Sequence, residues 1–271
     1  MARSNTDIPT VRSAFGIVGF SILLSLVLGA TVIIVFSSGD IESASHLVTA
    51  MALFAGQGFM ALPVIIYFLI KKAPVLRSVQ LNPVPPRLLL HSMVFGLGLL
   101  IVYDEIDRLI SKILTPPDSL FDLSPFLSMD APFTALIIIL TIVVFAPIGE
   151  EIVFRGFLQR SLQKNWGDPT RAVLVTSMFF ALIHMNPYWL IQIYLWGVIL
   201  GYLAYQTGSI IPSIILHGLN NGASILLNSS GLSIDKYYEW NGHVSPIIIL
   251  IGIVFLFFGF QQIQSFRKST S

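Results

Sequence analysis

A pair of adjacent carboxylates stands out in a chain that is otherwise strongly apolar. The pair is Glu150-Glu151, and Arg155 follows it after three residues. Glu151 and Arg155 have the spacing at which a carboxylate and a guanidinium meet on one face of a helix. Glu150 points to a different face, so its carboxylate is the one left to act as a general base. The group therefore predicts one ion-paired carboxylate and one that takes part in proton transfer.

Two further groups supply imidazoles. His184 follows Phe180 by four residues near the end of an expected helix. His217 and Asn221 are also four residues apart, so they share one face of their helix. Ionisable side chains are costly within a membrane and usually face a bundle interior or a wet cavity, which makes all these residues functional candidates.

A shared depth would allow the three groups to form one site. At a rise of about 1.5 Å per residue, His184 lies roughly 18 Å from the inner end of its helix. The corresponding depths of His217 and Asn221 are roughly 10 and 16 Å. Glu150 reaches a similar depth, roughly 15 Å, only if its helix continues well past the glutamates. We therefore predict one long helix over about 133–161 and one wet pocket that these four residues share.

The elements that position these residues are expected to be transmembrane helices. Hydrophobic residues make up 55% of the chain and charged residues 11%, and the mean hydropathy is +0.82. This composition leaves too little polar surface for a soluble particle. Uncharged stretches of the length that a bilayer requires predict an all-α, polytopic membrane bundle of about eight spans. The expected spans are Phe15–Phe36, Leu47–Ile70, Leu88–Tyr103, about 133–161, about 170–185, about 188–205, about 210–227 and Pro246–Ile263.

Local signals refine this outline. Apolar residues recur at helical spacing opposite the charges of residues 104–114, which predicts a separate amphipathic helix at the membrane interface. Asp168-Pro169 and Ser245-Pro246 are typical of a helix N-cap followed by proline in the first turn. Residues 1–271 are expected to form a single integral membrane domain, with the motifs in a core over about 131–228.

Charge predicts orientation and excludes one class of partner. Most Lys and Arg residues fall in the segments that face the cytoplasm if the N-terminus lies inside, so both termini are expected there. The net charge is only +1 and long basic runs are missing, which argues against nucleic acid as a partner. The absence of cysteine excludes disulfides and thiol nucleophiles.

The three groups, in this order and on membrane helices, resemble the motifs of the CAAX prenyl protease and bacteriocin-processing family of intramembrane proteases. The resemblance is to EExxxR at Glu150-Glu151 and Arg155, FxxxH at Phe180 and His184, and HxxxN at His217 and Asn221. It implies an endopeptidase of a bacterial cell membrane that cleaves a membrane peptide or lipidated protein. It further implies that Glu150 and His184 activate the attacking water and that His217 and Asn221 stabilise the oxyanion. Glu151 and Arg155 would support the site.

Other roles for the same residues stay open. Glu150, Glu151, His184 and His217 are also a plausible ligand set for Zn²⁺, although HExxH is absent, and we favour the metal-free mechanism. A non-catalytic protein for bacteriocin immunity or scaffolding is a second interpretation. A transporter with a proton relay is a third, but no inverted repeat supports it.

The structural alternatives for these groups are a solvated carboxylate pair at a helix end, a turn-capping histidine and interhelical hydrogen bonding. The remaining histidines have no partner at a meaningful spacing, so we expect a structural role for each. They are His46, His91 and His243.

Overall fold

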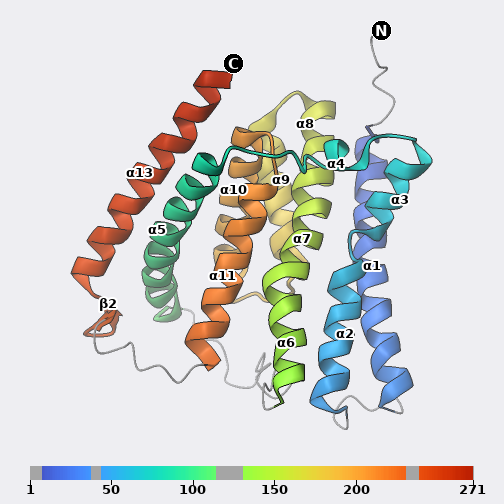
Figure 1. The fold of residues 1–271 in the computed structure, drawn as a ribbon, viewed down its shortest axis with the longest axis horizontal. Coiled ribbons are helices and arrows are strands. Elements are labelled where there is room, and N and C mark those ends of the chain that lie inside the picture. The colour runs from blue at the N-terminus through green and yellow to red at the C-terminus, as the bar shows by residue number, and fades with distance from the viewer. Residues whose placement is uncertain (1–7, 38–43, 114–130, 230–237, 271) are drawn as a thin grey trace. The chain divides into compact units, whose positions relative to one another are not determined.

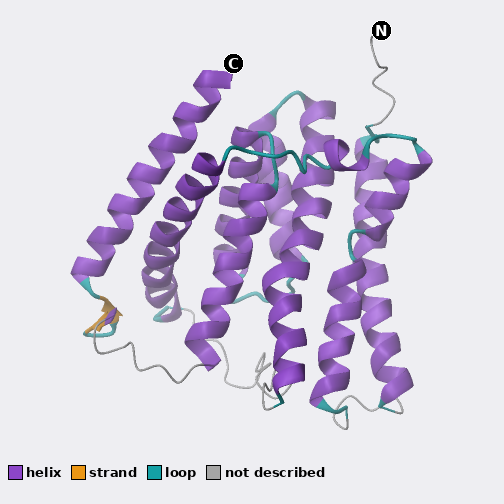
Figure 2. Cartoon of the chain, viewed as in Figure 1, coloured by secondary structure: helices purple, strands orange, loops and turns teal. Residues whose placement is uncertain are grey.

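Helices make up almost the whole of the chain that the computed structural model describes (Figures 1 and 2). The described residues are 8–37, 44–113, 131–229 and 238–270. The expected all-α class is confirmed for them. One two-stranded hairpin is added that the sequence patterns did not predict.

The chain divides into two compact units. The first joins Met1–Leu81 to Phe121–Ser177, and the second joins Asn82–Leu120 to Met178–Ser271. The boundary falls within helix α9 (Pro169–Leu182), so the last turn of α9 belongs to unit 2. The Glu150 group therefore lies in unit 1, and both motif histidines lie in unit 2.

Unit 1 is built from the apolar helix α1, the interrupted span formed by α2 and α3, the short α4 and one long helix. Its elements are α1 (Val11–Phe36), α2 (His46–Phe59), α3 (Leu62–Ile70), α4 (Val75–Ser78), α6 (Pro132–Leu140), η2 (Thr141–Phe145), α7 (Ala146–Glu151), η3 (Ile152–Gln159) and α8 (Arg160–Trp166). Helix α2 packs against both α1 and α6. The second expected span is interrupted between α2 and α3, where Pro63 occupies the first turn of α3, because proline lacks the N–H that a continuous helix needs.

The long helix predicted over about 133–161 is confirmed. Residues Pro132–Trp166 form one uninterrupted helical run, from α6 to α8. Two stretches of it, η2 and η3, are π-helical. The first π-helical stretch ends two residues before Pro147, where a wider turn relieves the clash between the proline ring and the preceding turn. The second stretch begins directly after Glu151, so the carboxylate pair sits between two π-helical segments.

Five helical stretches in the described part of the chain are long and apolar enough to cross a membrane. They are Val11–Phe36, His46–Ile70, Pro86–Ser111, Pro132–Trp166 and Pro246–Phe266. The protein is therefore a multi-pass membrane protein. The other three expected spans correspond to α9, α10 (Leu190–Thr207) and α11 (Ile211–Ser229), which are not among the five. Polar side chains such as Gln192 and His217 lower the hydropathy of α10 and α11.

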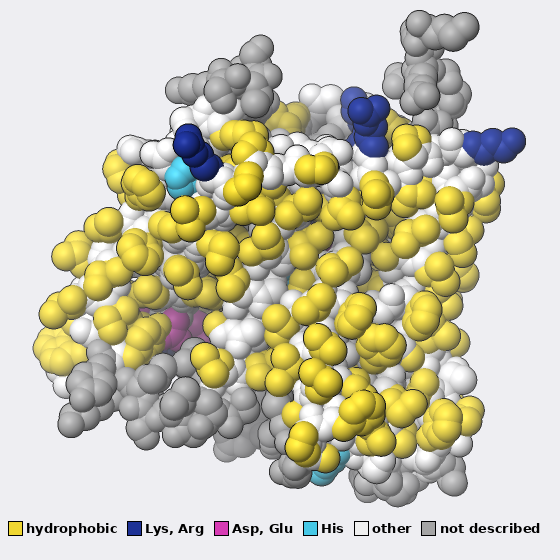
Figure 3. Space-filling model, viewed as in Figure 1, with side chains coloured by type: hydrophobic (Ala, Val, Ile, Leu, Met, Phe, Trp, Pro, Cys, Tyr) yellow, Lys and Arg dark blue, Asp and Glu magenta, His cyan; other side chains and the backbone are white. Residues whose placement is uncertain are grey.

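The surface agrees with a lipid environment. Hydrophobic side chains cover most of the face shown in Figure 3, and Lys and Arg side chains are few. Large apolar side chains such as Ile34 of α1 and Phe257 of the C-terminal helix are well exposed. Such exposure is a liability in water but suits contact with acyl chains.

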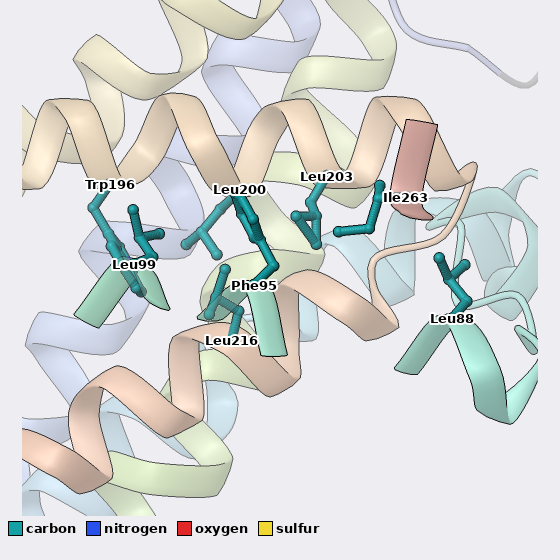
Figure 4. Packing of buried hydrophobic residues seen from close by; sticks show 8 residues of the cluster. All are labelled: Leu88, Phe95, Leu99, Trp196, Leu200, Leu203, Leu216 and Ile263. Carbon is teal, nitrogen blue, oxygen red and sulfur yellow. The ribbon is translucent and has the colours of Figure 1, made fainter. Parts of the chain in front are cut away.

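Unit 2 has an apolar core formed by four helices. Helix α5 (Pro86–Ser111) packs against α11 and α13 (Pro246–Thr270), and α10 packs against α11. Ser213 of α11 donates a hydrogen bond from Oγ to the carbonyl oxygen of Leu200 on α10, over 2.9 Å. Figure 4 shows the core side chains, which come from all four helices. They are Leu88, Phe95, Leu99, Trp196, Leu200, Leu203, Leu216 and Ile263.

Helices α5 and α13 approach each other at glycines. A Cβ atom added to Gly98 would lie 2.5 Å from the carbonyl oxygen of Gly252 and 2.6 Å from the backbone nitrogen of Leu256. Only glycine therefore fits at position 98. Small residues commonly let membrane helices pack this closely.

The separate interfacial helix expected over residues 104–114 is wrong. Helix α5 continues without a break from Pro86 to Ser111, so the charged segment is its last two turns. The segment contains no proline or glycine to end the helix. Its charges are compensated within unit 2: Arg108 donates to Asp104 over 3.1 Å, and Gln192 of α10 donates from Nε2 to Asp107 over 3.0 Å.

A short hairpin docks on this charged end of α5. Strand β1 (Glu239–Trp240) pairs with β2 (His243–Val244) across Asn241-Gly242, both of which have positive φ. Asn-Gly favours this tight hairpin turn.

The structure also corrects the expectation that His243 has no partner. Its Nδ1 lies 2.6 Å from Glu105 Oε1, and its Nε2 lies 2.8 Å from Lys112 Nζ. Both partners come from the other end of unit 2's sequence, so helical spacing could not reveal them. His243 is a structural residue that holds the hairpin.

Candidate active site

The Glu150 group is deeply buried in unit 1. Glu150 and Glu151 end α7, with 7% and 0% of their surface exposed, and Arg155 in η3 is also 0% exposed. Arg155 donates from Nη1 to Glu151 Oε1 over 2.7 Å. The predicted pairing of Glu151 with Arg155 is confirmed, and a solvated pair at a helix end is wrong for these residues.

Tight packing keeps water away from this ion pair. All residues of η3 are buried, and Phe157 meets Tyr67 and Phe68 of α3 in edge-to-face contacts, each with 5.7 Å between ring centroids. A Cβ on Gly156 would lie 2.5 Å from the carbonyl oxygen of Val79. The carboxylate and guanidinium therefore interact at low dielectric, where an attraction of this kind is strong.

His184 lies just beyond the end of α9. The predicted N-cap of this helix is confirmed, because the Arg171 N–H donates to Asp168 Oδ1 over 2.9 Å. The helix ends at Leu182, and Met185 has a φ of 49°, in the left-handed region that ends a helix. The Nδ1 atom of His184 lies 2.7 Å from the carbonyl oxygen of Phe180. A carbonyl oxygen only accepts hydrogen bonds, so Nδ1 carries the hydrogen and Nε2 carries the lone pair in the neutral ring.

The side chain of Phe180 brings the two motif histidines of unit 2 together. Its ring centroid is 4.8 Å from that of His184 and 5.8 Å from that of His217, with interplanar angles of 66° and 83°. Phe180 is 1% exposed and His217 is 5% exposed. Two imidazoles from α11 and the end of α9 therefore share one aromatic neighbour.

Asn221 lies one turn beyond His217 on α11. Its side chain is half-buried, and its Oδ1 lies 3.5 Å from Nδ2 of Asn220. The α-helical backbone places His217 and Asn221 on one face, as their spacing predicted. Imidazole and amide N–H groups on that face are suitable donors to a developing oxyanion.

Residues 132–223 match the family described as type II CAAX prenyl endopeptidase, Rce1-like. The chain carries an Rce1-like domain. The matched segment begins at the first residue of α6 and contains all three motifs. No curated protein and no solved structure matches the chain. The family is one of proteases, so the expected enzyme class is confirmed.

The Rce1-like domain is divided between the two units. Unit 1 contributes Glu150, Glu151 and Arg155, and unit 2 contributes the histidines and Asn221. Within each unit the predicted neighbours do meet: the carboxylate with its arginine, and the two imidazoles through Phe180. That Glu150 shares one pocket with the unit 2 residues stays a prediction.

The zinc alternative gains no support from this domain. The carboxylate of Glu151 is engaged by a buried guanidinium, and that positive charge opposes a cation on the same group. Among the described residues, no group of three or more His, Asp or Glu side chains could hold a metal ion. That Glu150, Glu151, His184 and His217 together bind a metal ion stays a prediction, because these residues are divided between the two units. The family match likewise gives no support to a role in bacteriocin immunity.

Two features of the Rce1-like domain escaped the sequence analysis. The sequence presents Phe180 only as part of a motif, whereas its ring contacts both histidines. Gln192 bonds Asp107 inside unit 2, and its Oε1 is a buried atom without a hydrogen-bond partner. A glutamine in the first turn of a largely apolar helix is the signal that could have revealed this interaction.

Proposed function

We propose that the chain is an intramembrane endopeptidase that hydrolyses a peptide bond in a membrane-associated peptide or lipidated protein. The observation that carries the proposal is the hydrogen bond from His184 Nδ1 to Phe180, which gives the imidazole of an endopeptidase domain a basic Nε2. An imidazole in this tautomer can accept a proton from water.

In the proposed reaction, Glu150 and His184 orient a water molecule and remove one proton as its oxygen attacks the scissile carbonyl carbon. The carbonyl oxygen becomes an oxyanion, to which His217 and Asn221 donate hydrogen bonds. The C–N bond then breaks, and the removed proton passes to the leaving amine. The products are a carboxylic acid and an amine, so the reaction consumes one water.

The two adjacent glutamates have different proposed roles. Glu151 is bound to Arg155 in a fully buried ion pair, which suits it to hold the helix rather than to exchange protons. Glu150 is the proposed base, and its position next to this ion pair keeps its own backbone rigid. A fixed base loses less free energy in reaching the reactive geometry.

The membrane arrangement extends the same proposal. We infer about eight spans, with α9, α10 and α11 added to the five long apolar helices. The distribution of Lys and Arg in the sequence supports a cytoplasmic location for both termini. The membrane proposed is that of a bacterial cell. The domain would then act on substrates that reach it from the lipid bilayer.

Comparative peptidomics tests the activity without knowledge of the substrate. Cells lacking this protein receive the wild type, Glu150→Gln or Glu239→Gln, at equal expression. The same chemical change at Glu239 is the control, because this residue lies in the hairpin and bonds Arg108 rather than a motif residue. The wild type and Glu239→Gln should generate the same membrane-derived peptides, and Glu150→Gln should generate none of them.

Each outcome decides the proposal. Products that persist in Glu150→Gln would contradict glutamate-dependent hydrolysis. If all three strains and the parent cells that lack the protein form identical peptides, the proposal that the protein is an endopeptidase is contradicted. Parallel assays with a chelator separate a metal requirement from the metal-free reaction.

A further inference from the structure

Phe180 makes two kinds of contact with the motif histidines. Its backbone carbonyl accepts the hydrogen bond from His184 Nδ1, and its side-chain ring lies edge-to-face with the same imidazole. The ring also lies edge-to-face with His217 of α11. One residue therefore restrains both imidazoles, and it does so from a position that is 1% exposed.

The ring is placed to fix orientation as well as to fill space. The hydrogen bond alone leaves the imidazole of His184 able to rotate about the line that joins its Nδ1 atom to the carbonyl oxygen of Phe180. A packed aromatic neighbour at 4.8 Å removes this freedom, because aromatic pairs prefer particular offset and edge-to-face geometries. The contact with His217 couples the second imidazole to the same ring, so the two histidines keep one relative orientation.

We propose that Phe180 is a positioning residue for the hydrolysis, whose ring sets the relative orientation of His184 and His217. The inference rests on the proposed function and deepens it. The ring acts through the two imidazoles and does not itself exchange a proton. Losing it should lower kcat more than it raises KM, since orientation matters most in the transition state.

The neighbouring Phe179 provides a matched control. It precedes Phe180 on the same helix, has the same side chain and is 41% exposed. Phe179→Leu therefore removes an aromatic ring of equal size from an outward-facing position. Phe180→Leu removes the ring between the histidines, and Phe180→Trp keeps an aromatic group there.

The test uses the full-length protein in detergent micelles and a farnesylated CAAX reporter peptide, or a peptide found by peptidomics if that reporter is not cut. We expect Phe180→Leu to lower kcat at least tenfold, with KM within about twofold of the wild type. It should also change the pH profile of kcat. Phe180→Trp should recover part of kcat, and Phe179→Leu should match the wild type.

A second readout is independent of the substrate. Diethyl pyrocarbonate acylates neutral imidazole nitrogen, and mass spectrometry follows the rate at His184 and His217 separately. Phe180→Leu should change both rates by at least about threefold, whereas Phe179→Leu should change neither. A thermal unfolding midpoint for each variant identifies any protein that fails to fold.

The two levels of inference fail in different ways. If cleavage depends on Glu150 but kcat, the pH profile and the acylation rates of a folded Phe180→Leu protein equal those of the wild type, the positioning role is wrong and the proposed function stands. If cleavage persists in Glu150→Gln, the glutamate-dependent reaction is wrong, and if cells without the protein form the same peptides, the endopeptidase is wrong as well. The acylation rates would then still decide whether the ring restrains the histidines.

Discussion

Arg155 donates a hydrogen bond to Glu151 over 2.7 Å, and neither side chain has any exposed surface. A pair of this kind is costly to form, because both charges lose their hydration. Once formed, each charge depends on the other. The pair therefore ties α7 to the π-helical η3, directly beside the proposed base.

Replacing only the arginine of this pair should strongly destabilise the protein. Arg155→Leu leaves a buried carboxylate without its counter-charge, and we expect a loss of about 3–5 kcal/mol in the free energy of unfolding. The double variant Glu151→Leu with Arg155→Leu should be more stable than the single one, because no buried charge remains. Thermal unfolding in detergent measures both. A single variant as stable as the wild type would show that the pair does not hold this helix.

The contact between α5 and α13 should tolerate only glycine at position 98. Gly98→Ala places a methyl group against backbone atoms of Gly252 and Leu256, which cannot move without shifting the helix. We expect a loss of about 1–3 kcal/mol in stability. Gly16→Ala in α1 is the control, because its new methyl group meets nothing within 4 Å, and it should stabilise by about 0.5–1 kcal/mol. Equal unfolding midpoints for the two variants would argue against this close approach.

Glu105 should control the docking of the hairpin. One carboxylate oxygen accepts from the Val244 N–H over 2.7 Å, and the other bonds His243. Glu105→Ala removes both bonds, so the Val244 amide should exchange its hydrogen about tenfold faster or more. Hydrogen exchange with mass spectrometry measures this. Amide exchange in α10 serves as the internal reference and should be the same in Glu105→Ala and the wild type. If the Val244 amide also exchanges at the same rate in both proteins, the docking is contradicted.

Tyr238 should make stability fall at alkaline pH. Burial, and then the neighbouring Asp104 carboxylate, raise the pKa of this phenol above its ordinary value. The stabilisation is complete below the unfolded pKa of about 10 and is lost as the pH rises toward the folded pKa, because only the unfolded chain releases the proton in that range. Unfolding midpoints measured between about pH 9 and 11 should fall more steeply for the wild type than for Tyr238→Phe. Parallel curves would show that the phenol is not held neutral.

Two features of the structure could be predicted from the spacing of residues along single helices. The Glu151–Arg155 pair and the Asp168 N-cap each join residues three or four positions apart, and the helical period fixes such neighbours. The rise per residue along a helix, which placed Glu150 level with the histidines only in a longer span, correctly predicted a long helix around Glu150. These features required no knowledge of how helices pack.

Contacts between distant segments could not be found in this way. His243 meets Glu105 and Lys112 across 138 and 131 residues. The apolar patterns that produce membrane helices are alike in every span, so they do not say which helices become neighbours. The same limit explains the wrong boundary at residues 104–114, where compensation from α10 and the hairpin allows charged residues to extend α5.

The sequence alone determined the class of protein, its principal spans and the residues of the three motifs, because hydrophobic length and helical period are local properties. Only the tertiary structure decided that Phe180 lies between His184 and His217, and that glycines let α5 approach α13. Those arrangements depend on close packing between side chains from separate helices. Such packing is a property of the folded chain and cannot be deduced from the sequence of any one segment.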